Sequence, residues 1–139
     1  RRLGPDRMDR FFPFRRLLQH GATLAFGSDW PIVSPDPIAG MRAAITGLDA
    51  DGRPVATDQN LTPLEALRGY TAGAALALGD GDVGMLRVGG HADVTVLSDD
   101  PRHADWVRNP PRVLATIVGG DVVYAEKRAA TGADLLGAR

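Results

Sequence analysis

The sequence contains no cysteine, and this absence excludes three kinds of chemistry at once. Disulfide bonds, zinc sites built on thiolates and cysteine nucleophiles all need a thiol, and none of the 139 residues supplies one. Any metal ion bound by this chain must therefore be held by histidine or carboxylate side chains.

The sequence also lacks a long apolar segment. No run approaches the roughly 20 apolar residues that a helix needs to cross a bilayer, and no basic stretch followed by an apolar one opens the chain. We therefore expect a cytoplasmic protein without a membrane partner.

Charge of neither sign is in excess. The chain has 16 Lys and Arg against 17 Asp and Glu, a formal net charge of −1, so no overall field draws it toward nucleic acid. Arginines do gather near the start, where they alternate with Phe11, Phe12 and Phe14. We interpret this cluster as a solvated face over an aromatic core, because a nucleic-acid groove needs a wider basic surface.

Two helices can be predicted in the first 50 residues. The apolar spacing of residues 14–20 indicates a helix that ends at Gly21. Asp36 followed by Pro37 is typical of an N-cap and the first helical residue, and this helix should continue toward Leu48.

A polar loop over residues 49–60 leads to a third helix start. Thr62 and Glu65 have the spacing of a capping box, and the helix they open should run toward Leu78. The small residues 71–75 of this helix imply close packing against another backbone.

Strand patterns follow the helices. Residues 92–98 alternate between apolar and polar types, and residues 112–125 form two runs joined by Gly119 and Gly120. Glycine tolerates positive φ, so this pair predicts a hairpin. Residues 128–139 show no sustained period, and we expect a flexible tail there.

The stretch TLAFGSDWP, residues 23–31, contains the main candidate for a functional residue. Its first four residues are typical of a buried strand of a parallel sheet, which need not alternate. Asp29 would lie just past the end of that strand, where sheets and barrels collect catalytic groups. The alternative is a turn aspartate that accepts hydrogen bonds from backbone N–H groups. Trp30 could line a substrate pocket or simply pack ahead of Pro31.

Four segments resemble the C-terminal end of a metal-dependent amidohydrolase of family 3. In chain order they are RFFPFRRLLQHGATLAFGSDWP, LTPLEALRGYTAGAALALG, VGMLRVGGHADVTVLSDDP and ATIVGGDVVY. The likeness implies an α/β fold in which residues 1–80 form the C-terminal end of a (β/α)8 TIM barrel, its last strand and flanking helices. Residues 81–127 would supply strands of a small composite β-sandwich.

The resemblance also implies an activity, the hydrolysis of a non-peptide C–N bond in a small amide, formamide or cyclic amide. The cofactor that the resemblance implies is a divalent metal, and zinc is the one expected for this family. Asp29 would bind this metal and exchange a proton with the attacking water. Ser28 and Trp30 would bind substrate at the barrel mouth.

The sequence departs from the family in its remaining metal ligands. The family has a His-x-His pair and further histidines with a Lys or Glu, whereas His20, His91 and His103 show no such spacing. A catalytic metal usually takes three or more protein ligands. We therefore expect this chain to be inactive alone, and it need not carry a metal.

A lone last barrel strand would also leave both of its edges unpaired. This predicts either pairing with a missing N-terminal part or a homo-oligomer. The alternative function is a non-catalytic, truncated paralogue that serves as a structural or oligomerisation module.

Overall fold

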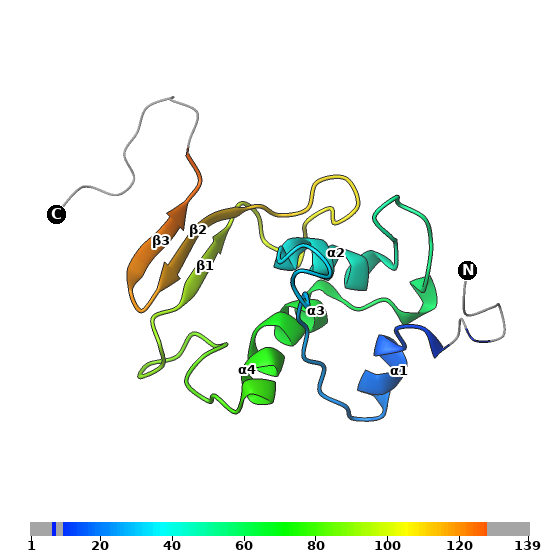
Figure 1. The fold of residues 1–139 in the computed structure, drawn as a ribbon, viewed down its shortest axis with the longest axis horizontal. Helices are drawn as coiled ribbons and strands as arrows, with labels where there is room; N and C mark the ends of the chain where they lie inside the picture. Colours follow the sequence, from blue (N-terminus) through cyan, green and yellow to red (C-terminus); the bar gives the residue numbers. More distant parts are fainter. Residues whose placement is uncertain (1–6, 8–9, 128–139) are drawn as a thin grey trace.

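A computed structural model gives the fold, and it describes residue 7 and residues 10–127 (Figure 1). Helices come first and a small sheet comes last, so the chain is α/β. The tail predicted for residues 128–139 lies outside the described residues. None of the described helices is long and apolar enough to cross a membrane. The elements are α1 (Phe14–Gln19), α2 (Pro37–Thr46), η2 (Thr57–Gln59), α3 (Pro63–Tyr70), α4 (Ala72–Leu78), β1 (Val94–Leu97), β2 (Val113–Val118) and β3 (Asp121–Ala125).

The first two helices begin and end where their local signals predict. Gly21, just after α1, has φ of 80°, the left-handed conformation that ends helices. The Asp36 side chain accepts a hydrogen bond from the N–H of Ile38 at 2.9 Å, so it caps α2. Left-handed Gly47 ends α2 before Leu48, so the helix is slightly shorter than predicted.

The third predicted helix is two helices. Thr62 and Glu65 form the predicted capping box at the start of α3. The backbone then leaves the helical region at Thr71, whose φ is −120° and ψ −96°, and α4 begins at the next residue. The Thr71 hydroxyl donates to the carbonyl of Leu67 at 2.8 Å. Threonine hydroxyls can bond to backbone carbonyls in this way and so compete with the regular hydrogen bonds of a helix. One continuous helix to Leu78 was therefore the wrong prediction.

The strand predicted for Thr23 to Phe26 does not form. Residues 22–28 have neither helix nor strand conformation, and the segment rises from α1 toward α2 as a plain trace (Figure 1). The physical reason is that a strand needs a neighbour to exchange backbone hydrogen bonds. Within the described residues, only β1, β2 and β3 pair as strands in a sheet.

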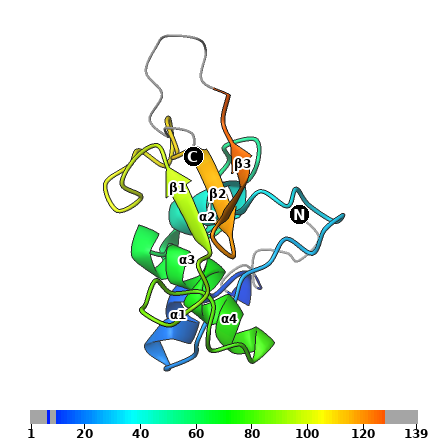
Figure 2. The same cartoon turned by 90° about the vertical axis from the view of Figure 1, so that its left-hand side faces the viewer.

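The three strands form an antiparallel sheet in the order β1-β2-β3 (Figure 2). This confirms both the strand and the hairpin predicted for residues 92–98 and 112–125. Gly119 and Gly120 have φ of 59° and 92°, as a tight hairpin turn requires. Their N–H groups also bond back to the start of β1, to Asp93 Oδ1 at 2.7 Å and the Ala92 carbonyl at 3.0 Å.

The hydrophobic core lies among the helices. Its buried members come from α2, α3, the loop before α3 and the connection between β1 and β2: Met41, Ala44, Leu61, Ala66 and Trp106. Phe14, Phe26 and Tyr70 pack against this cluster, with ring centroids 5.1 Å and 5.4 Å apart in succession. Of the aromatic residues near the chain start, Phe14 packs against the core as predicted, whereas Phe12 is 54% exposed.

Candidate functional site

Asp29 opens a tight turn directly after the unpaired segment. Its φ is 54°, in the left-handed region that aspartate tolerates better than most residues with a side chain. Its carbonyl accepts a hydrogen bond from the N–H of Ile32 at 2.9 Å, and the peptide between Trp30 and Pro31 is cis. Residues 29–32 thus form a turn with cis-proline in the third position, the arrangement of type VI.

The Asp29 side chain is exposed, and none of the described residues donates a hydrogen bond to its carboxylate. Asp36 and Asp105 behave differently, because their carboxylates accept from backbone N–H groups of Ile38 and of Val107 respectively. The turn is therefore closed by backbone atoms, and the exposed Asp29 carboxylate takes no part in it.

The neighbours of Asp29 differ in exposure. Ser28 is half-buried, whereas the Trp30 side chain is 68% exposed, so packing does not explain the tryptophan within this structure. Exposed apolar side chains continue along the turn at Ile32 and Val33, 75% and 57% exposed. Sequence reasoning did not single out these two, although their apolar character so soon after a turn aspartate was a readable signal.

The turn is anchored on both sides. Upstream, the N–H of Phe26 donates to the carbonyl of Gly69 in α3 at 2.9 Å. Downstream, the Ser34 hydroxyl accepts from the N–H of Asp36 at 3.3 Å, and Asp36 caps α2. Two helices therefore set where the Asp29 turn stands.

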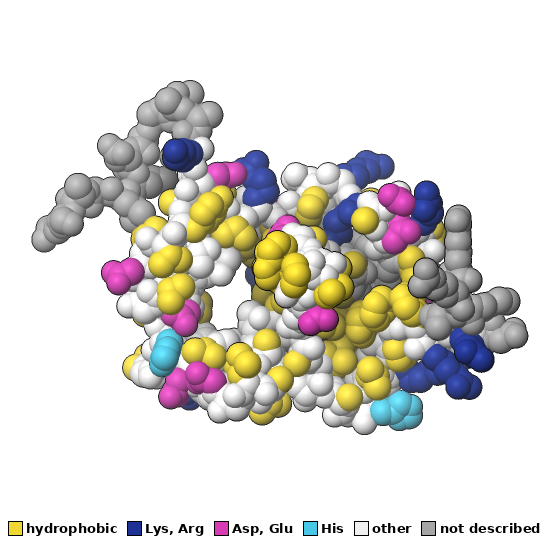
Figure 3. All heavy atoms as spheres, in the orientation of Figure 1, with side chains coloured by type: hydrophobic (Ala, Val, Ile, Leu, Met, Phe, Trp, Pro, Cys, Tyr) yellow, Lys and Arg dark blue, Asp and Glu magenta, His cyan; other side chains and the backbone are white. Residues whose placement is uncertain are grey.

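Two hollows lie elsewhere on the described part of the chain. One, of about 990 Å³, separates α2, α3 and α4 from the sheet, and Figure 3 shows an open gap there. The other, of about 540 Å³, is mainly apolar and is lined by aromatic side chains including Phe12, Phe14 and Tyr70. Neither of these two hollows is lined by Ser28, Asp29 or Trp30.

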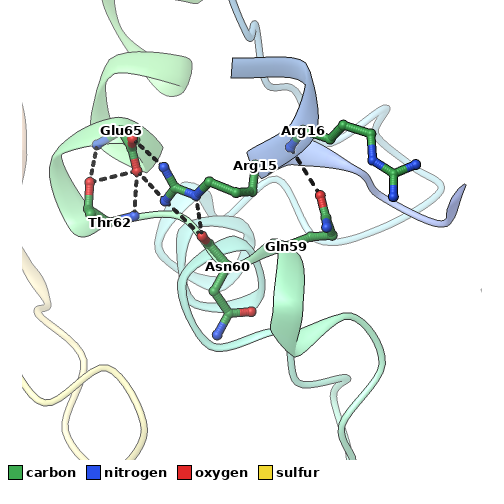
Figure 4. A network of polar contacts seen from close by, with 6 residues as sticks. All are labelled: Arg15, Arg16, Gln59, Asn60, Thr62 and Glu65. Carbon is green, nitrogen blue, oxygen red and sulfur yellow. Dashed lines mark hydrogen bonds and ion pairs between the residues drawn. The ribbon is translucent and has the colours of Figure 1, made fainter. Parts of the chain in front are cut away.

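A polar network fixes α1 against the start of α3 (Figure 4). The Arg15 guanidinium donates to both carboxylate oxygens of Glu65, at 2.8 and 2.7 Å, and to the carbonyl of Asn60 at 2.8 Å. Glu65 also accepts from the N–H of Thr62 at 2.7 Å. Sequence reasoning found the capping box but not Arg15, because the two partners are 50 positions apart.

The network changes the acidity of Glu65. Hydrogen bonds from Arg15, and then from the backbone and hydroxyl of Thr62, lower the pKa of the Glu65 carboxyl to about 2. Glu65 is therefore ionised near neutral pH, where its charge stabilises the contact between α1 and α3 and is not used for proton transfer. Glu65, the half-buried carboxylate whose pKa is shifted furthest, therefore has a structural role.

The described residues do not fit a catalytic metal by themselves. No three His, Cys, Asp or Glu side chains among them come close enough to share an ion. Within the described ranges, Asp29 belongs to no group of three candidate ligands, and His20 and His91 lie at the end of α1 and in the turn before β1. One carboxylate is fewer than the three or more ligands that such a site needs.

Comparison with a solved structure gives the fold, and comparison with a family model gives the family. An amidohydrolase from Thermotoga maritima MSB8 matches 82% of this chain and 26% of its own chain, with a TM-score of 0.60 and 21% identity. At this identity the likeness shows a shared fold. The family model described as the amidohydrolase family matches residues 1–124. The chain belongs to amidohydrolase family 3, which confirms the resemblance seen in the sequence.

Curated relatives agree with this family. An N-substituted formamide deformylase of Arthrobacter pascens is 34% identical over 117 residues, covering 83% of this chain and 22% of the relative. An imidazolonepropionase of Mycolicibacterium smegmatis is 36% identical over 115 residues, covering 81% and 27%. The chain spans about a quarter of the length of the curated relatives it matches.

Proposed function

We propose that this chain is the C-terminal segment of a metal-dependent hydrolase that cleaves a non-peptide C–N bond in an amide, a formamide or a cyclic amide. The family supports the class of reaction, and relatives named as a formamide deformylase and an imidazolonepropionase support a small-molecule substrate. The observation that carries the proposal is the exposed Asp29 residue, which is held in a defined turn while none of the described residues bonds to its carboxylate.

In this proposal residues 1–80 are the end of a (β/α)8 barrel, and residues 23–26 are its last strand. The support is an unpaired segment between two helices, together with the fold shared with part of the Thermotoga maritima protein. The strand would acquire its ladder from the other barrel strands, which the 139 residues do not include. Residues 81–127 would complete a β-sandwich in the same way.

The residues of this chain would have separate parts in the assembled enzyme. Asp29 would contribute one metal ligand and hold a proton, and the exposed ring of Trp30, with Ser28, would contact the substrate. The divalent metal, zinc by preference, supplies a bound water of lowered pKa. Because the described residues of this chain do not hold the metal, we propose no reaction step for the chain alone. We place the assembled enzyme in the cytoplasm.

Complementation tests this proposal. The 139-residue chain is mixed with a truncated Thermotoga maritima amidohydrolase that lacks the matching region, and zinc content and hydrolysis of N-substituted formamides are measured. We expect no stoichiometric zinc in the chain alone, but zinc and hydrolysis in the mixture. Asp29→Asn should lower the rate by about a hundredfold or more, as for loss of a proton-transferring group.

Asp121→Asn is the matched control, because Asp121 is an exposed aspartate of the sheet, at the start of β3. It should leave zinc content and rate unchanged. A mixture without zinc or hydrolysis, or an Asp29→Asn variant with full rate, would contradict the proposal.

A second candidate function is a non-catalytic structural or oligomerisation module. The observation that favours it is β3, which is exposed along its whole length and presents Val122, Val123 and Tyr124. Sedimentation velocity over a range of protein concentrations tests it. A metal-free oligomer would support the module, and a monomer at every concentration would argue strongly against it.

A further inference from the structure

The segment that leads to Asp29 lies against two glycines. The N–H of Phe26 donates to the carbonyl of Gly69 at 2.9 Å. A Cβ added at Gly69 would overlap the Phe26 ring, and one added at Gly73 would overlap the Leu24 carbonyl oxygen. Both glycines are buried. Their lack of a side chain is therefore what lets residues 24–26 approach α3 and α4 so closely.

The end of α3 provides the hydrogen-bond acceptor. Because α3 ends at Tyr70, Gly69 has one of the last four carbonyls of the helix, which an ending helix leaves without a partner of its own. The N–H of Phe26 meets this carbonyl. Because the helix breaks at Thr71, the Gly69 carbonyl at the end of α3 can bind residues 24–26, the segment before the Asp29 turn.

We infer that Gly69 and Gly73 are positioning residues for Asp29. Only two residues separate Phe26 from Asp29, and about 3.5 Å per residue is the longest reach of a chain, so a shift at Phe26 passes to the turn. The other side of the turn is fixed by the Asp36 cap of α2. This inference rests on the proposed function, because it assigns a role to the place where Asp29 stands.

The two contacts differ in a way that can be tested. At Gly69 the obstacle to a methyl group is the Phe26 ring, which a smaller side chain would remove. At Gly73 the obstacle is the backbone oxygen of Leu24, which remains whatever side chain is present. Phe26→Leu should therefore rescue Gly69→Ala but not Gly73→Ala.

NMR of the 139-residue chain gives a readout that does not depend on activity. We would record amide spectra of the unmodified chain, Gly69→Ala, Gly73→Ala and both combined with Phe26→Leu. We expect the resonances of Asp29, Trp30 and Ile32 to shift in the two glycine variants, while those of β2 and β3 stay in place. Adding Phe26→Leu should reverse the resonance shifts of the Gly69→Ala variant but not those of the Gly73→Ala variant.

Gly81→Ala is the matched control. A Cβ there meets nothing within 4 Å, and Gly81 does not have the left-handed φ that would strain alanine. Its spectrum should match that of the unmodified chain around Asp29. Folded Gly69→Ala and Gly73→Ala variants with unchanged resonances at residues 29–32, or equal rescue of both, would overturn the inference.

Hydrogen exchange covers the case in which a variant fails to fold. In the unmodified chain we expect the Phe26 amide to be protected and the amides of Gly27 and Ser28 to exchange faster. Free exchange at Phe26 would overturn the inference. The outcomes are separable: full activity of Asp29→Asn would refute the proposed function alone, and unchanged resonances would refute the positioning role alone.

Discussion

The helical body, residues 14–78, and the three-stranded sheet, residues 94–125, are stabilised by different interactions. The body holds nearly all of the buried apolar side chains and the Arg15–Glu65 network. Among the described residues, no buried core side chain comes from β1, β2 or β3. The strands are held by backbone pairing and by the turn contacts at Gly119 and Gly120.

The two regions meet through the connection between β1 and β2 rather than through the sheet face. Trp106 in this connection is 4% exposed, and its indole N–H donates to the Pro101 carbonyl at 2.9 Å. Arg42 of α2 donates to the carbonyls of Trp106 and Val107, at 3.1 and 3.3 Å. A small sheet needs a covered apolar face for independent stability. The comparison teaches that the core of the body is completed by Trp106 from the connection between β1 and β2, whereas the sheet depends on its connections.

The largest effect should follow from removing Trp106. Trp106→Ala would leave a cavity in the core of the helical body, and we expect a loss of about 3–5 kcal/mol in the free energy of unfolding. Urea unfolding followed by far-UV circular dichroism measures it. Trp30→Ala is the matched control, because its side chain is 68% exposed and should cost less than about 0.5 kcal/mol. Equal losses would mean that Trp106 contributes no more to the core than an exposed side chain does.

The next effect concerns Glu65 and is dependent on pH. Its pKa in the folded chain is about 2, against an ordinary 4.5, so the stabilisation is complete above about pH 4.5 and disappears as the pH falls through about 2. The side chains of Arg15 and Glu65 are 30% and 27% exposed. Allowing for solvent screening, we expect the interaction to stabilise the fold by roughly 1–2 kcal/mol near neutral pH.

The comparison of the unmodified chain with Glu65→Gln isolates this contribution from other carboxylates. The difference in unfolding free energy should be constant from about pH 5 to 7 and shrink toward pH 2. Added salt should reduce it only partly, because the pair is partly shielded from solvent. A difference independent of pH would show that the network contributes through packing instead.

A smaller effect distinguishes two aspartates near the candidate site. Asp36→Ala removes the cap of α2 and should cost about 1 kcal/mol. Asp29→Asn should cost almost nothing, because no described residue bonds to the Asp29 carboxylate and asparagine also tolerates left-handed φ. Thermal unfolding of both variants is the measurement. A destabilised Asp29→Asn would place Asp29 among the structural residues and weaken the proposed function.

Local signals made much of this fold predictable. The caps at Asp36 and Thr62 and the glycine hairpin each depend on residues within a few positions, and all three formed as expected. The strand predicted at residues 23–26 does not form in this structure because a strand is defined by its neighbours, and the described chain offers none to this segment. The break at Thr71 was also missed.

Long-range partners account for what the sequence could not predict around the site. Arg15 meets Glu65 across 50 positions, and the Gly69 carbonyl meets Phe26 through a fold-dependent contact. Asp29 itself could be singled out, because its place after an apolar run is a local pattern. That Asp29 is exposed, with no described residue bonded to its carboxylate, could only be learned from the structure.

The smallest effect should come from the sheet. Val123 on β3 is 62% exposed, and Val123→Thr keeps a β-branched side chain, so we expect a change within about 0.5 kcal/mol. Urea unfolding at two protein concentrations is the measurement. A loss above about 1 kcal/mol that disappears on dilution would mean that a second copy covers this strand, since only an intermolecular contact depends on concentration. A small loss at both concentrations would leave the strand free for the remaining strands of the proposed sandwich.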